Sequence, residues 1–334
     1  MHIEFDSIIY SLQKFGGASV YWKNIVSRIE ADKSVQVTES MACKVMRGIP
    51  VCSKANVFHS SHFRVTFLSQ AKTVTTVHDL TYELGIMGWG LKARMNTLER
   101  KRSYFNADAI ICISENTKSD LLKIYPGLKS QCPIYVIHHG FTAPDFHNLN
   151  STLGLKDSRY LLYVGGRKNY KNFDLALRGF VESNIWRDGY TLVCTGSDFT
   201  RQELEAFRHM GVEKAVVSVG MVDEAALFLL YKHAHCLLYT SRYEGFGLPL
   251  IEAMSVGCPV IGANISCIPE IVGSAGVLVD PDSPDQVARA VSNLGNQSLR
   301  DVLVSSGFAR SSQFSWDTSA SKHMEVYVST ASGN

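Results

Sequence analysis

The chain repeats one pattern along most of its length, in which short apolar runs typical of buried strands alternate with amphipathic helical patterns. Parallel strands need long crossover connections, usually helices, so this alternation predicts doubly wound α/β sheets. The first series predicts strands at residues 2–6, 35–37, 55–59, 73–77, 109–113 and 134–137, with helices at 18–30, 91–105 and 115–124. The second predicts strands at 160–164, 191–194, 215–219, 236–239, 260–261 and 277–279, with helices from about 171, 200, 223, 248 and 283.

Between the two series, residues 141–158 lose this periodicity and are rich in Pro, Asn, Ser, Thr and Gly. A chain of 334 residues is long enough for two domains of ordinary size. We therefore predict a Rossmann-like domain at 1–145, a linker at 146–158, a second Rossmann-like domain at 159–315 and a final helix at 316–334. Open α/β sheets bind ligands at the carboxyl ends of their strands, so we expect the two domains to face a cleft.

A glycine-rich turn follows the strand pattern at 236–239 and carries the densest chemical signal. Gly245 and Gly247 permit close backbone approach, and Pro249 suits the first position of a helix. The free N–H groups of a helix start attract an anion such as phosphate. Glu244 and Glu252 on either side can accept hydrogen bonds from hydroxyl groups, which suits a nucleotide-sugar. The alternative is that both glutamates are solvated or cap the helix.

A second glycine turn follows the strand pattern at 160–164. Gly165 and Gly166 precede Arg167, Lys168 and Lys171, which places cations at the carboxyl end of a strand, where they could neutralise a diphosphate. An isolated segment of this composition is more often a solvated basic loop. The anion site predicted at Gly247 favours the binding interpretation.

These motifs together resemble the retaining glycosyltransferases of family four, which have the GT-B fold. The string E-G-F-G-L-P-L-I-E from Glu244 is similar to that family's E-x7-E signature, and V-G-G-R-x-x-Y-K-N to its phosphate loop. Lys171 falls on the family's lysine, whereas Gly166 stands between Gly165 and Arg167, where the family's arginine usually follows directly. Further similarity lies in T-V-H-D-L, I-S-E-N-T and F-S-W-D. The Y-K-N form is closest to bacterial mannosyltransferases that build O-antigen or other surface polysaccharides.

The resemblance implies roles for particular residues. The residues implied in catalysis are His78, Arg167, Lys171 and Glu244. Those implied in holding the donor nucleotide-sugar are Gly16, Gly17, Gly166, Gly196, Gly220, Val222, Phe246, Gly247, Leu248 and Glu252. Arg167 and Lys171 would stabilise the departing diphosphate, Glu244 would hold hydroxyls of the donor sugar, Glu252 would hold the ribose, and His78 would lie near the transferred sugar.

By the same resemblance, the domain at 1–145 faces the acceptor, the domain at 159–315 binds the donor, and the helix at 316–334 crosses back to the first domain. The expected reaction is retaining transfer of a hexose, with GDP-mannose as the first donor to test. The acceptor is expected to be a saccharide, lipid-linked in surface-polysaccharide (O-antigen) synthesis. We predict no cofactor and no metal. Asp280 and Asp282 superficially match a D-x-D metal motif, but their position between strand and helix predicts a turn and cap.

Composition indicates the cellular compartment and the kinds of partner to expect. The eight cysteines form no C-x-x-C pair, and neither a signal peptide nor an apolar run of about 18 residues is visible, so a cytoplasmic protein with reduced thiols is expected. Residues 1–150 hold 17 Lys and Arg against 12 Asp and Glu, and the remainder holds 16 against 19, so the first half is the better candidate for an anionic surface. Nucleic-acid binding is not expected, because no basic-aromatic module is present.

The helix pattern at 91–105 permits two interpretations. Its cations are Lys92, Arg94, Arg100, Lys101 and Arg102, and an apolar stripe is formed by Leu91, Met95, Leu98 and Phe105, with Trp89 just before it. It is either an ordinary amphipathic helix with a charged outer face, or a peripheral contact with anionic lipid that would present a lipid-linked acceptor.

Three alternatives to a transferase remain open. A GT-B sugar-nucleotide epimerase would use the same fold and donor but consume the donor without an acceptor. A nicotinamide dehydrogenase could use Gly245 and Gly247, although Leu250 replaces the third glycine of that fingerprint. A non-catalytic binding protein on the same fold is disfavoured, because no expected charged position is missing.

Overall fold

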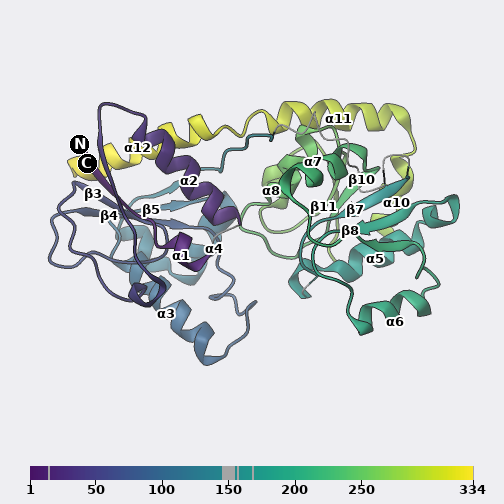
Figure 1. The fold of residues 1–334 in the computed structure, drawn as a ribbon, viewed down its shortest axis with the longest axis horizontal. Helices are drawn as coiled ribbons and strands as arrows, with labels where there is room; N and C mark the ends of the chain where they lie inside the picture. Colours follow the sequence, from purple (N-terminus) through teal and green to yellow (C-terminus); the bar gives the residue numbers. More distant parts are fainter. Residues whose placement is uncertain (14–15, 145–154, 156–157, 168, 334) are drawn as a thin grey trace. The chain divides into compact units, whose positions relative to one another are not determined.

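The computed structural model describes residues 1–13, 16–144, 155, 158–167 and 169–333. The chain divides into two compact units, each with its own sheet and core: unit 1 comprises Met1–Gly140 and Phe314–Asn334, and unit 2 comprises Phe141–Gln313. The sequence placed the corresponding boundaries at 145, 159 and 315. Most of the predicted linker at 146–158 lies outside the described residues. Figure 1 shows the elements of both units.

Unit 1 contains a parallel six-stranded sheet of order β2-β1-β3-β4-β5-β6. Its strands are β1 (His2–Asp6), β2 (Gln36–Ser40), β3 (Val57–Ser60), β4 (Lys72–Val77), β5 (Ala109–Cys112) and β6 (Ile134–Val136). Its helices are α1 (Ile9–Leu12), α2 (Gly17–Glu30), α3 (Leu91–Phe105), α4 (Glu115–Ile124) and α12 (Trp316–Ser332), with short 3-10 turns η1 (Lys44–Met46) and η2 (Pro126–Ser130). The chain reverses its winding between β1 and β3.

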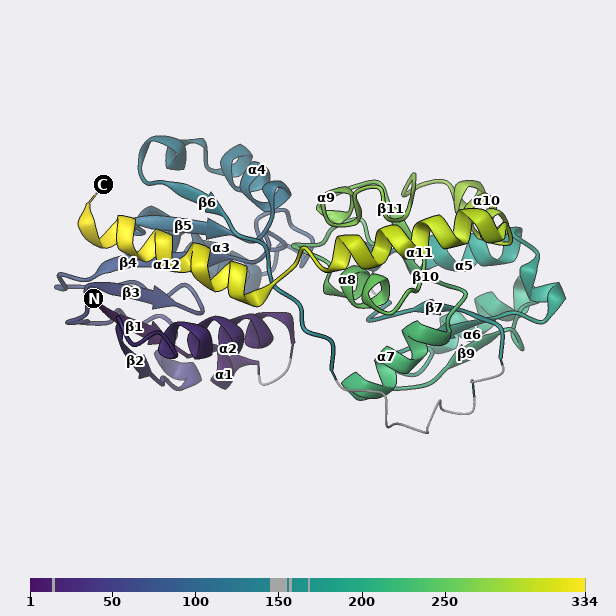
Figure 2. The same cartoon turned by 90° about the horizontal axis from the view of Figure 1, so that it is seen from above.

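The last helix of the chain completes the core of unit 1. Helix α12 packs along α2 and against β3 and β4, as Figure 2 shows. Trp316 and Tyr327 from α12 are buried with Phe5 of β1 and with Tyr21 and Trp22 of α2. Large apolar surfaces from both ends of the sequence therefore stabilise one core, because removing them from water is favourable.

Unit 2 contains a second parallel six-stranded sheet, of order β12-β11-β10-β7-β8-β9. Its strands are β7 (Tyr160–Tyr163), β8 (Thr191–Cys194), β9 (Val216–Ser218), β10 (Cys236–Tyr239), β11 (Val260–Ala263) and β12 (Val277–Val279). Its helices are α5 (Phe173–Glu182), α6 (Arg201–His209), α7 (Glu224–His233), α8 (Leu248–Ser255), α9 (Ile268–Val272), α10 (Pro284–Asn293) and α11 (Gln297–Ser311), with 3-10 turns η3 (Asn169–Lys171) and η4 (Ile185–Asp188).

In unit 2, β7, β8 and β9 extend the sheet in one direction and β10, β11 and β12 in the other. The winding therefore reverses between β7 and β10, and the loops that follow these two strands meet at the carboxyl edge of the sheet. Reversals of this kind are where open α/β sheets bind their ligands. The two predicted motifs follow β7 and β10, so the fold brings them together within one unit.

The predicted doubly wound α/β architecture is confirmed, since both sheets are parallel and every predicted strand is present. The short helices α1 and α9, of 4 and 5 residues, were not predicted. Residues 91–105 form the predicted helix, and four of its five cations are exposed, as a charged outer face requires. The interpretation as an ordinary amphipathic helix is nevertheless wrong about its apolar stripe, which an ordinary amphipathic helix would bury. Leu91 is 77% exposed and Leu98 68% exposed, whereas Arg100 is buried. Arg100 turns inward because Asp79 and Glu83 accept its hydrogen bonds there.

Candidate functional site

The phosphate loop, residues 165–172, is fastened to the end of β10. The Tyr163 hydroxyl donates to the Lys171 carbonyl at 3.1 Å, and the Thr240 hydroxyl donates to the Asn172 carbonyl at 2.9 Å. The Arg242 N–H donates to the Tyr170 carbonyl at 2.7 Å. Backbone carbonyls of the loop are thus held by residues of β7 and of the segment after β10. These contacts keep the phosphate loop beside the glycine-rich turn that follows β10.

Lys171 and Glu244 form the central contact of the site. Lys171 Nζ lies 2.6 Å from Glu244 Oε1, and the side chains are 23% and 13% exposed. The Glu244 backbone is fixed in turn, because its N–H donates to the Ser266 hydroxyl at 3.2 Å and its carbonyl accepts from that hydroxyl at 2.8 Å. A cation and a carboxylate are therefore held together at the winding reversal, partly open to solvent.

The turn after Glu244 depends on Gly247, which has φ 97° and caps the N-terminus of α8. A side chain there would be strained, and its Cβ would lie 2.9 Å from Leu250 Cδ1. The Cys267 thiol donates to the carbonyls of Glu244 and Phe246, both at 3.1 Å. Phe246 is buried and Leu248 is half-buried, so the predicted donor-binding residues at 246–248 form a rigid entry to the helix.

Glu252 lies one turn into α8 and is half-buried. Its Oε2 accepts a hydrogen bond from the Tyr231 hydroxyl of α7 at 2.9 Å. Burial raises the pKa of Glu252 to about 7, although the Tyr231 hydrogen bond acts in the opposite direction. The two glutamates of the signature therefore differ in state: Glu244 faces a cation, whereas Glu252 titrates near neutrality.

Arg167 does not join the Lys171–Glu244 pair. Its side chain is 4% exposed, and Nε lies 2.6 Å from Glu203 Oε1 of α6. Nη2 donates to the carbonyls of Ser197 and Asp198, both at 2.8 Å, and the guanidinium lies over the Phe199 ring. The guanidinium thus holds the loop after β8. Its predicted contact with the departing diphosphate stays a prediction. Lys168 lies outside the described residues.

The predicted glycines at the ends of β7, β8 and β9 form one continuous edge. Gly196 donates its N–H to the Gly220 carbonyl at 2.8 Å, and Gly165 donates to the Thr195 hydroxyl at 3.3 Å. Gly166 is exposed and Val222 is half-buried. Backbone groups of these glycines thus contribute to the edge beside the phosphate loop.

In unit 1, His78 directly follows β4 and Gly17 begins α2, with Gly16 as its N-cap. The His78 ring meets the Tyr21 ring edge-on, with centroids 4.9 Å apart. Burial lowers the pKa of His78 to about 4, with Asp79 acting to raise it, so the imidazole is neutral near pH 7. His78 therefore packs against Tyr21 of α2, the helix that begins at Gly17.

Unit 1 contains two buried polar networks that were not predicted from the sequence. In the first, the Tyr21 hydroxyl bonds Thr76 Oγ1 at 2.9 Å and His323 Nε2 at 2.7 Å. His59 likewise bonds Thr76 and the Tyr327 hydroxyl, at 2.9 and 2.6 Å. The members come from strands β3 and β4 and from helices α2 and α12, so no local motif marks them.

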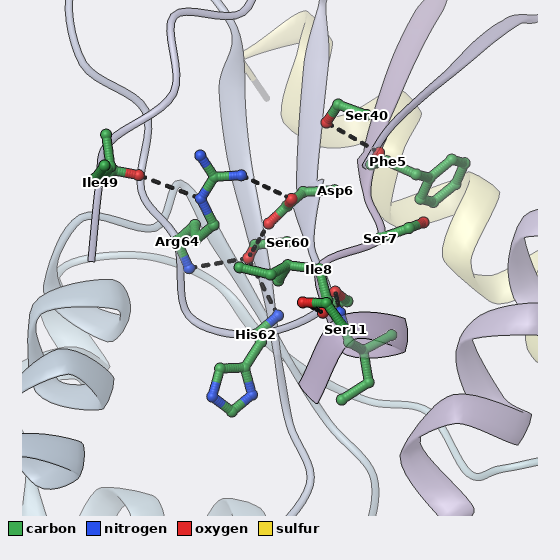
Figure 3. A network of polar contacts seen from close by, with 12 residues as sticks. Phe5, Asp6, Ser7, Ile8, Ser11, Ser40, Ile49, Ser60, His62 and Arg64 are labelled. Carbon is green, nitrogen blue, oxygen red and sulfur yellow. Dashed lines mark hydrogen bonds and ion pairs between the residues drawn. The ribbon is translucent and has the colours of Figure 1, made fainter. Parts of the chain in front are cut away.

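The second network lies at the carboxyl ends of β1 and β3 and is drawn in Figure 3. Arg64 Nη1 donates to Asp6 Oδ1 at 2.9 Å, and both side chains are buried. The Ser60 hydroxyl donates to Asp6 Oδ2 at 3.3 Å and accepts from the Arg64 N–H at 2.9 Å. Polar residues after two adjacent strands are the only sequence signal for this network.

The D-P-D segment forms the predicted turn. The Asp282 N–H donates to Asp280 Oδ1 at 2.8 Å, and Asp282 pairs with Arg242 at 2.5 Å. Ser283 caps α10 by accepting from the Gln286 N–H. Within the described part of the chain, no group of three His, Cys, Asp or Glu side chains is arranged to hold a metal ion. Each of the eight cysteines is a free thiol.

Two family models match the chain. "Glycosyltransferase Family 4" matches residues 40–143, and "Glycosyl transferases group 1" matches residues 158–297, so the two cover 244 of the 334 residues. The first segment lies in unit 1 except for its last three residues, and the second lies in unit 2. The longer match includes both the phosphate loop and the E-x7-E segment.

Curated relatives include O-antigen chain mannosyltransferase B of Escherichia coli, 28% identical over 82% of this chain and 74% of the relative. O-antigen chain mannosyltransferase RfbU of Salmonella typhimurium is 27% identical over 61% of this chain and 55% of the relative. This chain therefore spans about three quarters of the first relative and little more than half of the second.

Solved structures with the same fold include sucrose-phosphate synthase from Thermosynechococcus elongatus, with a TM-score of 0.74, 18% identity and full coverage of both chains. Anabaena HepE in complex with UDP and glucose has a TM-score of 0.72 and 18% identity, over 98% of this chain and 100% of HepE. Among the helices that the structure describes, none combines the length and hydropathy needed to cross a membrane.

Proposed function

The chain belongs to the group 1 and family 4 glycosyltransferases, and we propose that it moves a hexosyl group from a nucleotide diphosphate sugar to a hydroxyl of a saccharide. The observation that carries this proposal is the Lys171–Glu244 pair at the winding reversal of unit 2, 2.6 Å long and partly open to solvent. An ammonium group there can stabilise a departing diphosphate, and a carboxylate can hold sugar hydroxyls.

The nucleotide would lie along the carboxyl edge of the second sheet. Its ribose hydroxyls would donate to Glu252, and its base would meet backbone groups near Gly196, Gly220 and Val222. The diphosphate would lie between Lys171 and the N-terminus of α8, where the partial positive charge of the helix start favours an anion. In place of the direct phosphate contact predicted from the sequence, we propose that Arg167 orders this edge through Glu203.

We propose mannose as the transferred sugar and GDP-mannose as the donor, because the relatives above are mannosyltransferases. HepE, which shares the fold, is solved with UDP and glucose, so UDP-glucose is the second donor to test. Stereochemical retention and independence of a metal ion are part of the proposal. Lys171 and the start of α8 would supply the positive charge that Mg²⁺ supplies elsewhere.

The acceptor would be a lipid-linked saccharide of surface-polysaccharide synthesis, and α3 would contact an anionic membrane. Trp89 is 67% exposed, and it lines a cavity of about 420 Å³ together with Leu98 and the cations Arg94 and Lys101. Exposed apolar side chains beside cations are typical of surfaces that bind anionic lipid. The cytoplasmic face of the membrane is the proposed location.

The test is a binding screen followed by a transfer assay. Thermal shifts with GDP, UDP, ADP and dTDP should single out one nucleotide, since a ligand at about 100 times its dissociation constant stabilises by about 2.7 kcal/mol. The matching nucleotide-sugar should then be consumed rapidly only when an alkyl glycoside acceptor is added. Rapid consumption without an acceptor would favour the epimerase, and binding without turnover of any donor would favour the non-catalytic protein.

A further inference from the structure

Tyr231 of α7 is buried beside Glu252, which lies one turn into α8. The Tyr231 side chain is fully enclosed, and its hydroxyl donates to Glu252 Oε2 at 2.9 Å. Glu252 itself is half-buried. Helices α7 and α8 pack against each other, so this hydrogen bond joins two neighbouring elements of unit 2.

The Tyr231 hydroxyl is held at this position. The Tyr160 hydroxyl of β7 donates to the Leu230 carbonyl at 2.8 Å, which fixes the backbone of α7 one residue before Tyr231. The Tyr231 ring also meets the Phe228 ring edge-on, with centroids 5.9 Å apart. The hydroxyl therefore has little freedom to move away from the Glu252 carboxyl.

The two oxygens of the Glu252 carboxyl have different surroundings. Oε2 accepts from Tyr231, whereas within the described part of the chain Oε1 accepts no hydrogen bond. Oε1 keeps surface that solvent can reach, because it does not belong to the buried polar atoms that lack a partner. A carboxylate oxygen can accept more than one hydrogen bond. One oxygen is thus held by the protein, while the other is available to a ligand.

The charge of this carboxyl also depends on α7. Burial raises the pKa of Glu252 to about 7, the Tyr231 hydrogen bond acts to lower it, and the negative charge of Glu224 acts to raise it. Among the described titratable groups on the elements packed against α8, these two residues of α7 act on Glu252. A hydrogen bond to the ionised form of a carboxyl stabilises that form. Removing the Tyr231 hydroxyl would therefore leave less of Glu252 ionised near pH 7.

We propose that Tyr231 is a positioning residue of the nucleotide site, which holds the Glu252 carboxylate so that its free oxygen selects ribose over 2′-deoxyribose. The inference rests on the proposed function, in which Glu252 accepts from the ribose hydroxyls, and adds a residue that acts through Glu252. A site built to bind a hydroxyl group discriminates strongly against an analogue without it, because the polar group of the site is left unpaired. Tyr231 itself does not touch the nucleotide, since its side chain is fully buried.

The test compares Tyr231→Phe with Tyr160→Phe. Each change removes the hydroxyl of a buried tyrosine and one hydrogen bond, but Tyr160 donates to a backbone carbonyl and not to Glu252. Calorimetry at pH 7 measures binding of GDP and 2′-deoxy-GDP, or of the uracil or adenine pair if the screen identifies UDP or ADP. Wild type and Tyr160→Phe should bind the ribonucleotide about tenfold or more tightly, and in Tyr231→Phe this preference should fall to about threefold or less.

The pH dependence separates positioning from a general loss of structure. In wild type, affinity for the ribonucleotide should rise as Glu252 ionises, through about pH 7. In Tyr231→Phe this rise should move to higher pH by about half a unit or more, whereas Tyr160→Phe should follow wild type. The same nucleotide is used throughout, so ionisation of its phosphates contributes equally to each profile.

A double variant tests whether Tyr231 acts through Glu252. Tyr231→Phe added to Glu252→Gln should change the ribose preference by less than about twofold, because the carboxylate that Tyr231 holds is already absent. The inference is overturned if the effect of Tyr231→Phe persists in the Glu252→Gln background. It is also overturned if Tyr231→Phe and Tyr160→Phe show equal preferences and equal pH profiles.

Failure of the proposed function would look different. These measurements need nucleotide binding but no acceptor and no turnover, so they decide the role of Tyr231 even in a chain that transfers no sugar. Selection of dTDP in the screen would overturn the inference without contradicting a transferase, since the sugar of dTDP lacks the 2′-hydroxyl. A wild-type chain that binds none of the four nucleotides would overturn both.

Discussion

Glu244 and Glu252 belong to one short motif, but their side chains have different partners. Glu244 lies 2.6 Å from the Lys171 ammonium, so its negative charge is compensated in the free protein. Glu252 accepts a hydrogen bond from the neutral hydroxyl of Tyr231, and burial raises the pKa of Glu252 to about 7. In the proposed complex, a diphosphate would compete with Glu244 for Lys171, whereas ribose hydroxyls would add hydrogen bonds to Glu252.

Replacing Lys171 by Ala should lower turnover by about two orders of magnitude or more, because charge stabilisation in a preorganised site contributes at least that much. The measurement is kcat with the donor that the binding screen identifies. Arg201→Ala, which removes an exposed cation on α6, is the control. Turnover of Lys171→Ala within about threefold of wild type would remove the lysine from its proposed role.

If Glu252 holds the ribose as proposed, nucleotide affinity should increase by up to about tenfold as the pH rises from 6 to 8, because hydroxyl groups donate best to an ionised carboxylate. The raised pKa has the opposite effect on the stability of the protein without nucleotide. Ionising Glu252 is less favourable in the folded chain than in the unfolded chain, so the free energy of unfolding falls as the pH rises from about 4.5 to about 7. Calorimetric titration from pH 6 to 8 should show the slope in wild type and a flat profile in Glu252→Gln. Equal slopes would assign the effect to another group.

The buried Asp6–Arg64 pair should contribute more to the stability of unit 1 than the Arg28–Asp317 pair at its surface. Arg64→Leu leaves a buried carboxylate without its cation and should cost about 3–5 kcal/mol, measured by urea unfolding at pH 7. Burial already raises the pKa of Asp6 despite Arg64, so the deficit should shrink at low pH, where the carboxyl is protonated. Arg28→Leu, which breaks a largely exposed pair with Asp317, should cost less than about 1 kcal/mol. Similar losses in both variants would contradict this ranking.

The residues of the site that sequence could predict are those defined by local motifs. Lys171, Glu244 and Glu252 follow strands in short, specific strings, and the order of the strands brings them together. The position of Arg167 could not be predicted in the same way, because Glu203 lies 36 residues further along the chain.

Among the elements, α3 departs most from its sequence pattern. The helix turns polar groups inward, including Asn96, Arg100 and Ser103, while its apolar stripe remains exposed. The segment that comprises η1 and the residues after it, between β2 and β3, adds exposed apolar side chains at Val45 and Ile49 and is tied to α3 by the Arg47–Glu99 pair. Hydrophobic periodicity locates a helix correctly but cannot tell which face is buried when buried carboxylates bind a cation.

Vesicle co-sedimentation tests the proposed role of α3. The protein should bind vesicles that contain phosphatidylglycerol more strongly than phosphatidylcholine vesicles. Arg94→Glu with Lys101→Glu should weaken this binding by about tenfold or more, since each cation near the surface contributes about 1 kcal/mol. Arg178→Glu on α5 of unit 2 is the matched control. Equal binding of wild type and the double variant would contradict membrane contact through α3.

At the scale of the whole molecule, alternation alone predicted two parallel sheets, because a parallel sheet of this size admits few other connections. The strands were located well since each is a short buried run bounded by polar residues, as in Tyr160–Tyr163 and Cys236–Tyr239. The buried polar networks of unit 1 were not predicted. They join residues up to 302 positions apart, as Tyr21 and His323 are, and long-range pairing leaves no periodic trace.

Helix α12 makes the order of synthesis differ from the order in which the cores are completed. Residues 141–313 form unit 2 without the chain's last segment, but unit 1 needs Trp316, His323 and Tyr327 for its core. During translation, the N-terminal sheet therefore emerges first and waits for the final helix, while unit 2 can close in the meantime. A ribosome that stops before residue 314 would release a chain with a complete second core and an open first one.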